Sequence, residues 1–317
     1  MDDMVIRGLR RFGIGIGAAV LLAATATGCS GGDEHAGHDQ GAAPGVLQGF
    51  SHPESVLVAG DSWFVSNVGA AQDPTAEDGD GFLTKLDRAG KVTAQKAIPR
   101  SGDAPLNAPK GMAYSDNKVF VADIDRIVGY DVDSLGQVFE AKVEGEAPTL
   151  LNDIAVLDAK TLLVTDSLRG SVYKLDLESK RFATLSTAVP GANGIVADSS
   201  GKTAYVAGIG ADFQGGDLFV LDLTRAPAQP KKVGAVHGLL DGLALLPDGN
   251  LAVSDWVGLA TPAPGTIKIY RPDGTEAGAV KFPENLIGPA DFTVDGSGKN
   301  LLVPAMVDNK VAVVALG

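Results

Sequence analysis

The sequence contains a single cysteine, Cys29, among 317 residues. No disulfide can form within the chain, so the folded part must be held together by packing alone. Residues 45–317, the predicted folded part, have no thiol for nucleophilic chemistry and no Gly-x-Ser-x-Gly motif of the kind that marks a serine nucleophile. Covalent catalysis by a free cysteine or by a serine of this kind is therefore not expected.

Histidine and basic residues are also scarce. Four histidines are present, and Lys plus Arg number 26 against 39 Asp plus Glu, which gives a net charge of −13. A histidine-rich transition-metal site is not expected from so few ligands. Nucleic acid is not expected as a partner, because its phosphate backbone is bound through Lys and Arg. The Gly-x-x-x-x-Gly-Lys loop of nucleotide-binding proteins is absent as well.

Long apolar runs are missing apart from one short segment near the N-terminus, Ile14–Ala24. This run is shorter than a typical membrane-spanning helix, and it follows the basic residues Arg7, Arg10 and Arg11. A basic region followed by a short apolar run is typical of a secretory signal peptide. Residues 1–28 are therefore predicted to be a signal peptide rather than part of the fold.

The signal ends in Ala26-Thr27-Gly28-Cys29, which resembles the lipobox of bacterial lipoproteins. In that motif small residues precede a cysteine that receives the lipid. Residues 29–44 are rich in Gly, Ala, Asp and His, and we expect a flexible tether there. The sequence thus predicts an exported, extracytoplasmic lipoprotein, anchored to a bacterial membrane only through lipid on Cys29. An ordinary cleaved signal peptide beside a chance cysteine is the alternative.

The remaining residues, 45–317, repeat one pattern of two short apolar strands joined by a tight turn. Six copies of this hairpin can be aligned, at 53–67, 109–123, 151–166, 192–208, 240–256 and 289–304. A spacing in the forties with paired short strands is typical of the blades of a β-propeller. We therefore predict an all-β fold, a six-bladed β-propeller, since six copies favour six blades over seven.

A propeller must close its ring, and the last copy holds only three strand-like runs. Closure removes sheet edges that would otherwise remain unpaired. We predict that Val46–Phe50 supplies the missing strand from the N-terminal side. The acidic insertion Gly69–Gly81 is expected to be a solvated surface loop, and shorter insertions follow at Ile209–Gly216 and Val257–Gly265.

One position stands out when the copies are aligned: the residue just before each first strand. It is occupied by Glu54, Lys110, Asn152, Asn193, Asp241 and Ala290. The innermost strands of propeller blades start at one mouth of the central channel, so these side chains are expected to form a ring. Four of them carry carboxylate or amide oxygens, which suit Ca²⁺, Mg²⁺ or Mn²⁺ better than Zn²⁺. The sequence therefore predicts a divalent-cation site at the channel mouth, with Ca²⁺ as the favoured ion.

The same positions carry a resemblance to a known family. Four dipeptides open blades of the predicted propeller: Pro53-Glu54, Asn152-Asp153, Asn193-Gly194 and Asp241-Gly242. Through them, residues 50–316 resemble the regucalcin and gluconolactonase family of sugar lactone hydrolases. The resemblance implies that Glu54, Asn193 and Asp241 hold one divalent ion, with Asn152 close by as a ligand of metal or substrate. It also implies lactone hydrolysis, with Asp241 as the base that assists the attacking water.

Two features leave a different interpretation open. Leu150 stands where that family often has an arginine that orients substrate, and Lys110 lies within the ring. Lys110 could pair with Glu54 or Asp241 and satisfy the ring without a metal. Asn-Gly and Asp-Gly are also favoured turn dipeptides in their own right. The alternative to an enzyme is a non-catalytic extracytoplasmic scaffold that binds a small ligand or a protein.

Two histidines are expected near the channel mouth because they precede the ring positions of blades one and five. There, His52 and His237 could bind substrate or move a proton. Asp153 and Asp291 follow the ring by one residue and are expected to add negative potential. The predicted partners are a small-molecule ligand or substrate and, through the lipid, a membrane, and the protein is expected to be a monomer.

Overall fold

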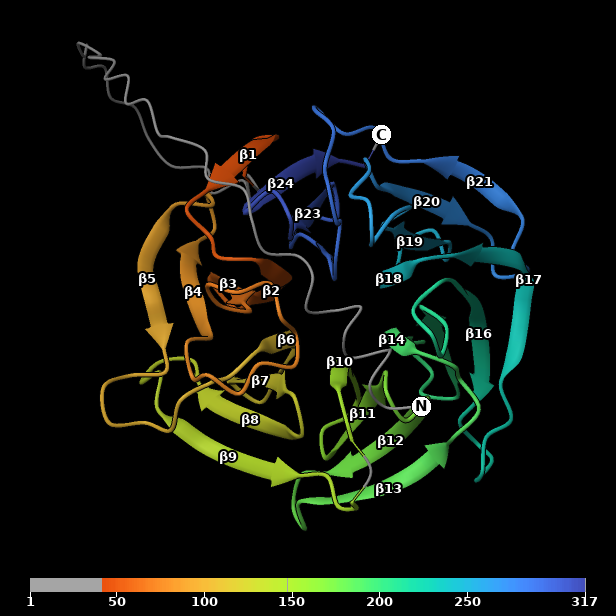
Figure 1. Ribbon diagram of the computed structural model, residues 1–317, viewed down its shortest axis with the longest axis horizontal. Helices are drawn as coiled ribbons and strands as arrows, with labels where there is room; N and C mark the ends of the chain where they lie inside the picture. The colour runs from red at the N-terminus through yellow and green to blue at the C-terminus, as the bar shows by residue number, and fades with distance from the viewer. Residues whose placement is uncertain (1–41, 147, 317) are drawn as a thin grey trace.

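The computed structural model describes residues 42–146 and 148–316, and within these residues it contains 24 strands and no helix. The strands form six four-stranded antiparallel sheets set around a central axis (Figure 1). The predicted all-β, six-bladed propeller is therefore confirmed. Within the same residues, nothing helical is long and apolar enough to cross a membrane.

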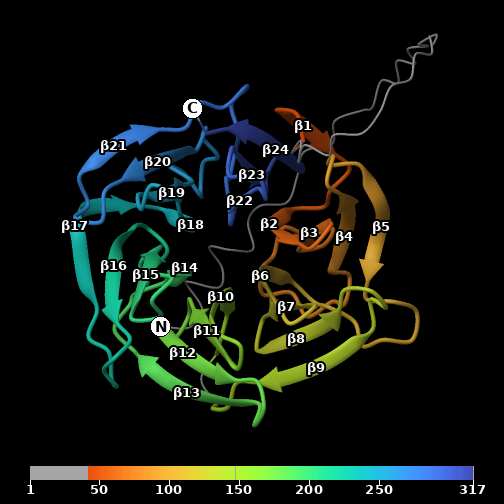
Figure 2. The same ribbon diagram turned by 180° about the vertical axis from the view of Figure 1, so that it is seen from behind.

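The strands of each blade follow one another from the centre to the rim (Figure 2). Blade one comprises β2 (Pro53–Ala59), β3 (Ser62–Asn67), β4 (Phe82–Asp87) and β5 (Val92–Ile98). Blade two comprises β6 (Pro109–Ser115), β7 (Lys118–Asp123), β8 (Arg126–Asp131) and β9 (Gln137–Lys142). Blade three comprises β10 (Leu151–Asp158), β11 (Thr161–Asp166), β12 (Ser171–Asp176) and β13 (Arg181–Ser186). Blade four comprises β14 (Ala192–Ala197), β15 (Thr203–Gly208), β16 (Gly216–Asp222) and β17 (Lys231–Gly238). Blade five comprises β18 (Leu240–Leu245), β19 (Leu251–Asp255), β20 (Thr266–Tyr270) and β21 (Glu276–Ala279). Blade six comprises β22 (Thr293–Val294), β23 (Asn300–Ala305), β24 (Lys310–Ala315) and, as its outermost strand, β1 (Gly45–Gln48).

The ring is closed by the N-terminal strand. β1 lies antiparallel beside β24, with Gly45 opposite Val313 and Gln48 opposite Lys310. The predicted closing role of Val46–Phe50 is confirmed, with the strand itself running from Gly45 to Gln48. The pairing covers an edge of β24 that would otherwise be exposed.

The packed part of the chain begins earlier than the predicted tether allowed. Ala42 is 6% exposed and packs in one apolar cluster with Phe50, Trp63 and Val313. The side-chain amide of Asn300 also donates to the carbonyl oxygen of Ala42. The folded part therefore starts no later than residue 42, rather than at residue 45. The predicted signal peptide, most of the tether and the lipidation site at Cys29 lie outside the described residues.

The apolar core lies between neighbouring blades. Each of six clusters joins two adjacent sheets. Between blades two and three, Phe120 and Phe139 pack with Leu162 and Tyr173, and the two phenylalanine rings meet edge to face at 5.4 Å. A strand such as β11 is buried on both faces, so its apolar residues run together instead of alternating. No blade buries its faces alone, and the copies stabilise one another.

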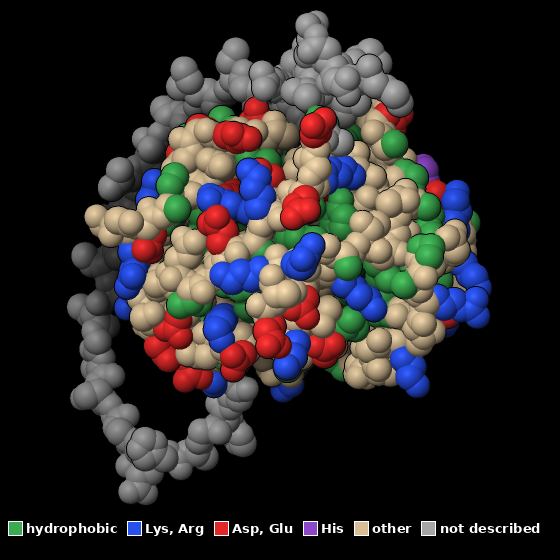
Figure 3. Space-filling view, turned by 90° about the horizontal axis from the view of Figure 1, so that it is seen from below, with side chains coloured by type: hydrophobic (Ala, Val, Ile, Leu, Met, Phe, Trp, Pro, Cys, Tyr) green, Lys and Arg blue, Asp and Glu red, His purple; other side chains and the backbone are tan. Residues whose placement is uncertain are grey.

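The outer surface mixes charges of both signs. On the face shown in Figure 3, acidic and basic side chains lie interspersed. Rim ion pairs such as Lys142–Asp125 at 2.6 Å and Lys310–Glu284 at 2.8 Å are partly exposed. Pairs of this kind contribute about 0–1 kcal/mol each. The stability of the fold therefore comes mainly from the contacts between blades.

Each innermost strand of blades one to five contains an extra residue near its start. In blade two, Pro109 lies opposite Asp123 and Met112 opposite Val121, so β6 uses one more residue than β7. Equivalent bulges open the other four of these blades. The ring residues of these five blades are thus the second residues of their strands, not residues before the strand as predicted, whereas Ala290 of blade six does precede β22. Because a β-bulge re-aims side chains, this irregularity accounts for how the ring residues reach one cavity.

Candidate metal centre

A cavity of about 90 Å³ lies where the innermost strands begin. Its polar wall consists of Glu54, Gln72, Lys110, Asn152, Asn193 and Asp241. Five of these six residues are members of the predicted ring, each from a different blade. The structure therefore brings the four predicted oxygen ligands together with Lys110. Ala290, at the sixth ring position, is fully buried and supplies no polar side chain.

All four predicted ligands have a buried oxygen atom without a hydrogen-bond partner. These atoms are Glu54 Oε2, Asn152 Oδ1, Asn193 Oδ1 and Asp241 Oδ1. Only two other buried side-chain oxygens of the described residues, on Asp80 and Tyr130, are unpaired in this way. Leaving such an atom unpaired costs about 1–3 kcal/mol, and more when the group is charged. A cation that prefers oxygen ligands would satisfy all four at once.

The donor set has only two carboxylates. Among the described residues, no group of three or more His, Cys, Asp or Glu side chains is placed to hold a metal. An ion in this cavity would therefore depend on the amide oxygens of Asn152 and Asn193 as well as on Glu54 and Asp241. Carboxylates combined with amide oxygens are a normal ligand set for Ca²⁺, so the residues fit the predicted ion.

Trp256 fixes the orientation of Asp241. Its indole Nε1 donates to Asp241 Oδ2 over 2.7 Å, which leaves Oδ1 as the unpaired atom. Trp256 is 8% exposed and lines the cavity. Asn193 is held more loosely, with its side-chain amide donating to the carbonyl oxygen of Leu240 over 3.5 Å. Trp256 was not predicted as a site residue, although it ends the repeat copy that contains Asp241.

Burial dominates the electrostatics of the two carboxyl groups in the cavity. It raises the pKa of Glu54 well above its usual value, and the charges of Asp241 and Asp291 raise it further. Burial also raises the pKa of Asp241 to about 7, with the charge of Asp291 adding to the effect. Burial disfavours the negative charge of both groups, and a bound cation would stabilise that charge. The electrostatics of the ring therefore fit a divalent ion.

Lys110 does not pair with these carboxyl groups in the predicted way. Its Nζ donates to the carbonyl oxygen of Ala108 over 2.7 Å and to that of Pro74 over 3.2 Å. Within the described part of the chain, no hydrogen bond or ion pair joins Lys110 to Glu54 or Asp241. Burial lowers the pKa of Lys110 to about 8. The interpretation of the ring as a lysine–carboxylate ion pair is therefore wrong in its geometry.

The glycines that follow two ring residues serve close packing of the inner strands. A Cβ atom on Gly194 would lie 2.2 Å from the carbonyl oxygen of Asp241, and one on Gly242 would lie 2.5 Å from that of Ala290. Both glycines are in strands, and neither has a positive φ. The turn interpretation of Asn193-Gly194 and Asp241-Gly242 is therefore wrong. Glycine is needed there because the backbone of the next blade approaches closely.

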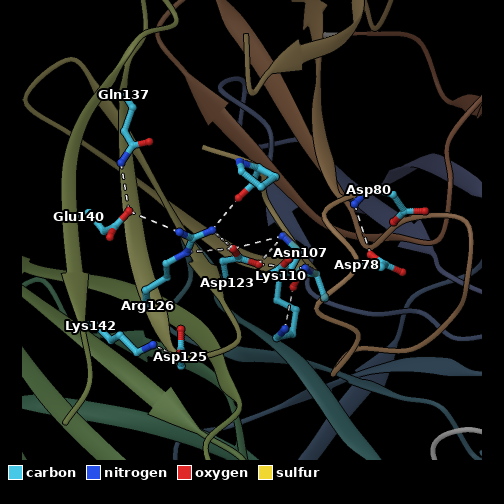
Figure 4. A network of polar contacts seen from close by, with 12 residues as sticks. Asp78, Asp80, Asn107, Lys110, Asp123, Asp125, Arg126, Gln137, Glu140 and Lys142 are labelled. Atoms are coloured by element: carbon cyan, nitrogen blue, oxygen red, sulfur yellow. Dashed lines mark hydrogen bonds and ion pairs between the residues drawn. The ribbon is translucent and has the colours of Figure 1, made fainter. Parts of the chain in front are cut away.

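Buried carboxylates anchor the chain as it enters the innermost strands. Asp123, at the end of β7, accepts hydrogen bonds from the backbone N–H groups of Asn107 at 3.0 Å and Ala108 at 2.9 Å (Figure 4). Both groups lie just before Lys110. Equivalent hydrogen bonds join the N–H of Leu150 to Asp166 and the N–H of Leu239 to Asp255. These contacts fix the start of three innermost strands and thereby the position of their ring residues.

The two predicted histidines lie outside the cavity. His52 Nδ1 is 3.0 Å from the carbonyl oxygen of Gly69. His237 lies on β17, the outermost strand of blade four, where its exposed ring is 3.0 Å from Asp217 Oδ1. Neither side chain lines the cavity, so the structure does not bring them to the predicted site. The prediction that His237 lies at the channel mouth is wrong. His237 is on the outermost strand of blade four, and the chain then crosses to the innermost strand of blade five before it reaches Asp241.

Asp153 and Asp291 line a second cavity of about 240 Å³. Asp153 accepts hydrogen bonds from the N–H of Ile195 at 2.7 Å and of Ile154 at 2.6 Å, and Asp291 accepts one from the Ser55 hydroxyl. Both carboxyl groups are thus partnered, unlike the ring oxygens. The charge of Asp291 nevertheless raises the pKa of Glu54 and Asp241, as expected for a source of negative potential.

The apolar wall of the first cavity was not predicted. It consists of Pro74, Leu150, Ile209, Phe213, Trp256, Leu259 and Met306. Four of these seven, together with Gln72, come from the three insertions between strands. The expectation that Gly69–Gly81 is only a solvated loop is therefore wrong for Gln72 and Pro74. Insertions have no counterpart in the other copies, so the repeat alignment held no signal for them.

No protein-family model and no curated protein matches the sequence. Among solved structures, the chain is similar to Kuenenia stuttgartiensis hydrazine synthase, with a TM-score of 0.56 at 16% identity over 82% of this chain and 75% of that one. It is also similar to a catalytically inactive virginiamycin B lyase from Staphylococcus aureus with quinupristin. That match has a TM-score of 0.58 at 12% identity, over 86% of this chain and 99% of the other. Identities this low support a shared fold alone, and membership of the regucalcin and gluconolactonase family stays a prediction.

Proposed function

We propose that the protein binds one divalent cation, Ca²⁺ in preference to Mg²⁺ or Mn²⁺, at the mouth of the propeller channel. The observation that carries this proposal is the set of four buried, unpaired oxygens on Glu54, Asn152, Asn193 and Asp241 around one cavity. The two carboxylates would match the double charge of the ion, and the two amides would add neutral oxygen ligands.

We further propose that the site hydrolyses a lactone or a similar small ester. A bound divalent ion would polarise the ester carbonyl and make a water ligand more acidic. Asp241 would accept a proton from the attacking water, since Trp256 holds one of its oxygens and leaves the other free. Asn152 would orient the substrate or complete the metal site, and the apolar wall would hold the body of the substrate.

A non-catalytic scaffold that binds a small ligand or a protein at the same mouth is the second candidate. Two observations favour it. Leu150 presents an apolar side chain to the cavity, where an arginine would orient a polar substrate. Among the described residues that line the cavity, none is a histidine that could move a proton. This function needs binding at the mouth but no turnover.

Melting of the purified protein with increasing Ca²⁺ or Mn²⁺ tests the metal site. We expect Tm to rise with cation concentration, because a ligand that binds only the folded state stabilises it by about 2.7 kcal/mol at one hundred times Kd. Asp241→Asn keeps the shape of the side chain and removes one charge, so it should weaken this response. Asp153→Asn is the matched control, since that carboxylate lines the other cavity.

The outcomes separate the candidates. A parent protein whose Tm does not respond to Ca²⁺, Mg²⁺ or Mn²⁺ would overturn the metal site. If cations raise Tm but the protein hydrolyses no member of a small lactone panel, the enzyme proposal is wrong and the non-catalytic scaffold is supported. Cation-dependent hydrolysis that is lost in Asp241→Asn and kept in Asp153→Asn would establish the lactone hydrolase.

We also propose that the protein is exported and held at a bacterial membrane by lipid on Cys29. This proposal rests on the basic region, the short apolar run and the lipobox-like end of residues 1–29. The membrane would then be a partner only through the lipid, and the propeller would act outside the cytoplasm as a monomer.

A further inference from the structure

Lys110 is a buried cation that is held by neutral acceptors. Its side chain is 1% exposed and lines the cavity. Nζ contacts two such acceptors, the carbonyl oxygens of Ala108 and Pro74. No ion pair joins it to any of the described carboxylates. Lysine is almost never fully buried without a charged partner, so this arrangement requires an explanation.

The donors of Lys110 are only partly used. An ammonium group has three N–H donors, and two of them are accounted for by the two carbonyl oxygens. One donor is therefore left at the cavity wall, and the positive charge meets those of Asp123, Glu54 and Asp73 only without direct contact. The carboxylates of Glu54 and Asp241 would be matched by the two charges of a divalent ion, on the function proposed above. Among the described residues, Lys110 would then face only the charges of Asp123 and Asp73, neither of which is in direct contact with its Nζ.

The rest of the wall describes the ligand that could match this charge. Leu150, Phe213 and Met306 give the cavity a largely apolar lining. A ligand held there needs an apolar body, one group that a hard cation binds, and one anionic group. A phosphate or sulfonate would leave several acceptor atoms facing apolar side chains, which is costly. A carboxylate has fewer acceptors to satisfy.

We propose that Lys110 is an anion-binding residue, and that the natural ligand is a small lactone, ester or ketone with a separate carboxylate. This deepens the proposed function, on which it rests for the carbonyl end of the ligand. The cation would take the carbonyl oxygen, Lys110 would take the carboxylate, and the apolar wall would hold the atoms between. Lys110 thus determines specificity and takes no part in the chemical step.

Levulinate and methyl levulinate test the proposal, because they share a ketone and differ in charge. Binding is measured by calorimetry on the full folded domain with saturating Mn²⁺ at neutral pH. We expect the parent to bind levulinate on the order of tenfold more tightly than its ester, the scale of a hydrogen bond to a charged group. Lys110→Gln keeps a donor for the carbonyl oxygens but has no charge, so it should lose this preference. Lys110→Arg should keep it.

Two results would overturn the anion site. Equal affinities for acid and ester in the parent would show that the cavity does not recognise charge. A preference that persists in Lys110→Gln would show that the carboxylate binds elsewhere, for example to the cation. Lys110→Met is a second neutral variant, and circular dichroism and melting establish that both are folded. The comparison of acid and ester in the parent stands without either variant.

Repeating the titration with a chelator separates this proposal from the metal site. If cations do not change Tm and the Lys110-dependent preference for levulinate survives, the anion site stands and the metal site falls. If cations raise Tm while acid and ester bind alike, the metal site stands and the anion site falls.

Discussion

Asp241 differs from the other buried carboxylates in its hydrogen bonding. One of its oxygens accepts from Trp256, and the other has no partner. Asp123 and Asp153, by contrast, are buried carboxylates whose oxygens accept backbone hydrogen bonds. Burial alone therefore does not distinguish the proposed ligands in this protein. They combine an unpaired oxygen with a place in the wall of one cavity.

Trp256→Phe is expected to weaken cation binding without removing a ligand. The change deletes the Nε1 donor, keeps an aromatic ring, and frees Asp241 to rotate. Loss of a partner that orients a metal ligand typically costs tenfold to one-hundredfold in affinity, so we expect a loss of about that size. Calorimetric titration with Ca²⁺ measures it.

Trp63→Phe is the matched control for this prediction, since the chain has two tryptophans and Trp63 packs between blades one and six. It should lower Tm and leave the Ca²⁺ affinity unchanged. Equal Ca²⁺ affinities of Trp256→Phe and the parent would show that the indole does not orient Asp241.

Strands and loops differ in how far the sequence predicts them. The hairpins recur six times, so the blades, the closing strand and the ring residues follow from an alignment of the repeats with one another. Phe213 and Leu259 line the cavity from insertions that each occur in one copy only. Aligning the copies therefore could not predict their positions. The error at His237 has a different cause. It is four residues from Asp241 in sequence, but it lies on the outermost strand of blade four, whereas Asp241 lies on the innermost strand of blade five.

The bulge at the start of the innermost strands also could not be predicted from the sequence. One extra residue on an innermost strand moves its side chains to the other face, yet a repeat alignment does not show which residues are paired across the hairpin. The ring residues could be identified by type and spacing. Their position inside the strand, and the close approach that requires Gly194 and Gly242, follow from the packing of neighbouring blades.

Truncation of the closing strand is expected to be costly. A chain starting at residue 42 should melt like one that keeps the predicted tether, because residues 30–41 include little apolar surface to bury. Starting at residue 51 removes β1 and Phe50, exposes β24, and opens the apolar cluster between blades six and one. We expect a loss of several kcal/mol, on the scale of removing a core element. Urea unfolding measures the difference, and equal midpoints would contradict the closing role.

As a whole molecule, the described part of the protein is a closed ring of six blades. The apolar clusters run between all six pairs of neighbouring blades, so each sheet is fixed by two others. The cavity that holds the ring residues opens at the centre, where five blades contribute to one wall. A site of this kind exists only when the ring is complete.

Cys29→Ser is expected to release the protein from its membrane. The lipid on Cys29 is the proposed anchor, and the predicted signal peptide is removed on export. Fractionation of the producing bacterial cells should find the parent in the membrane fraction and the variant mainly in the soluble fraction. A processed variant that stays with the membrane would contradict the lipoprotein prediction. The Tm of the two purified propellers should be the same, since Cys29 belongs to the predicted flexible tether.

The pairing of β1 with β24 also sets the order of events as the chain is made. Gly45 and Val313 are partners, yet nearly the whole domain separates them in sequence, and contacts between such distant residues form slowly. The first strand to be synthesised must wait for the last, while the blades between them can already form hairpins from local contacts. A chain interrupted before Lys310 would keep two open edges and would tend to pair with other chains. The ring can therefore close only after β24 has been synthesised, because β1 has no other strand to pair with among the described residues.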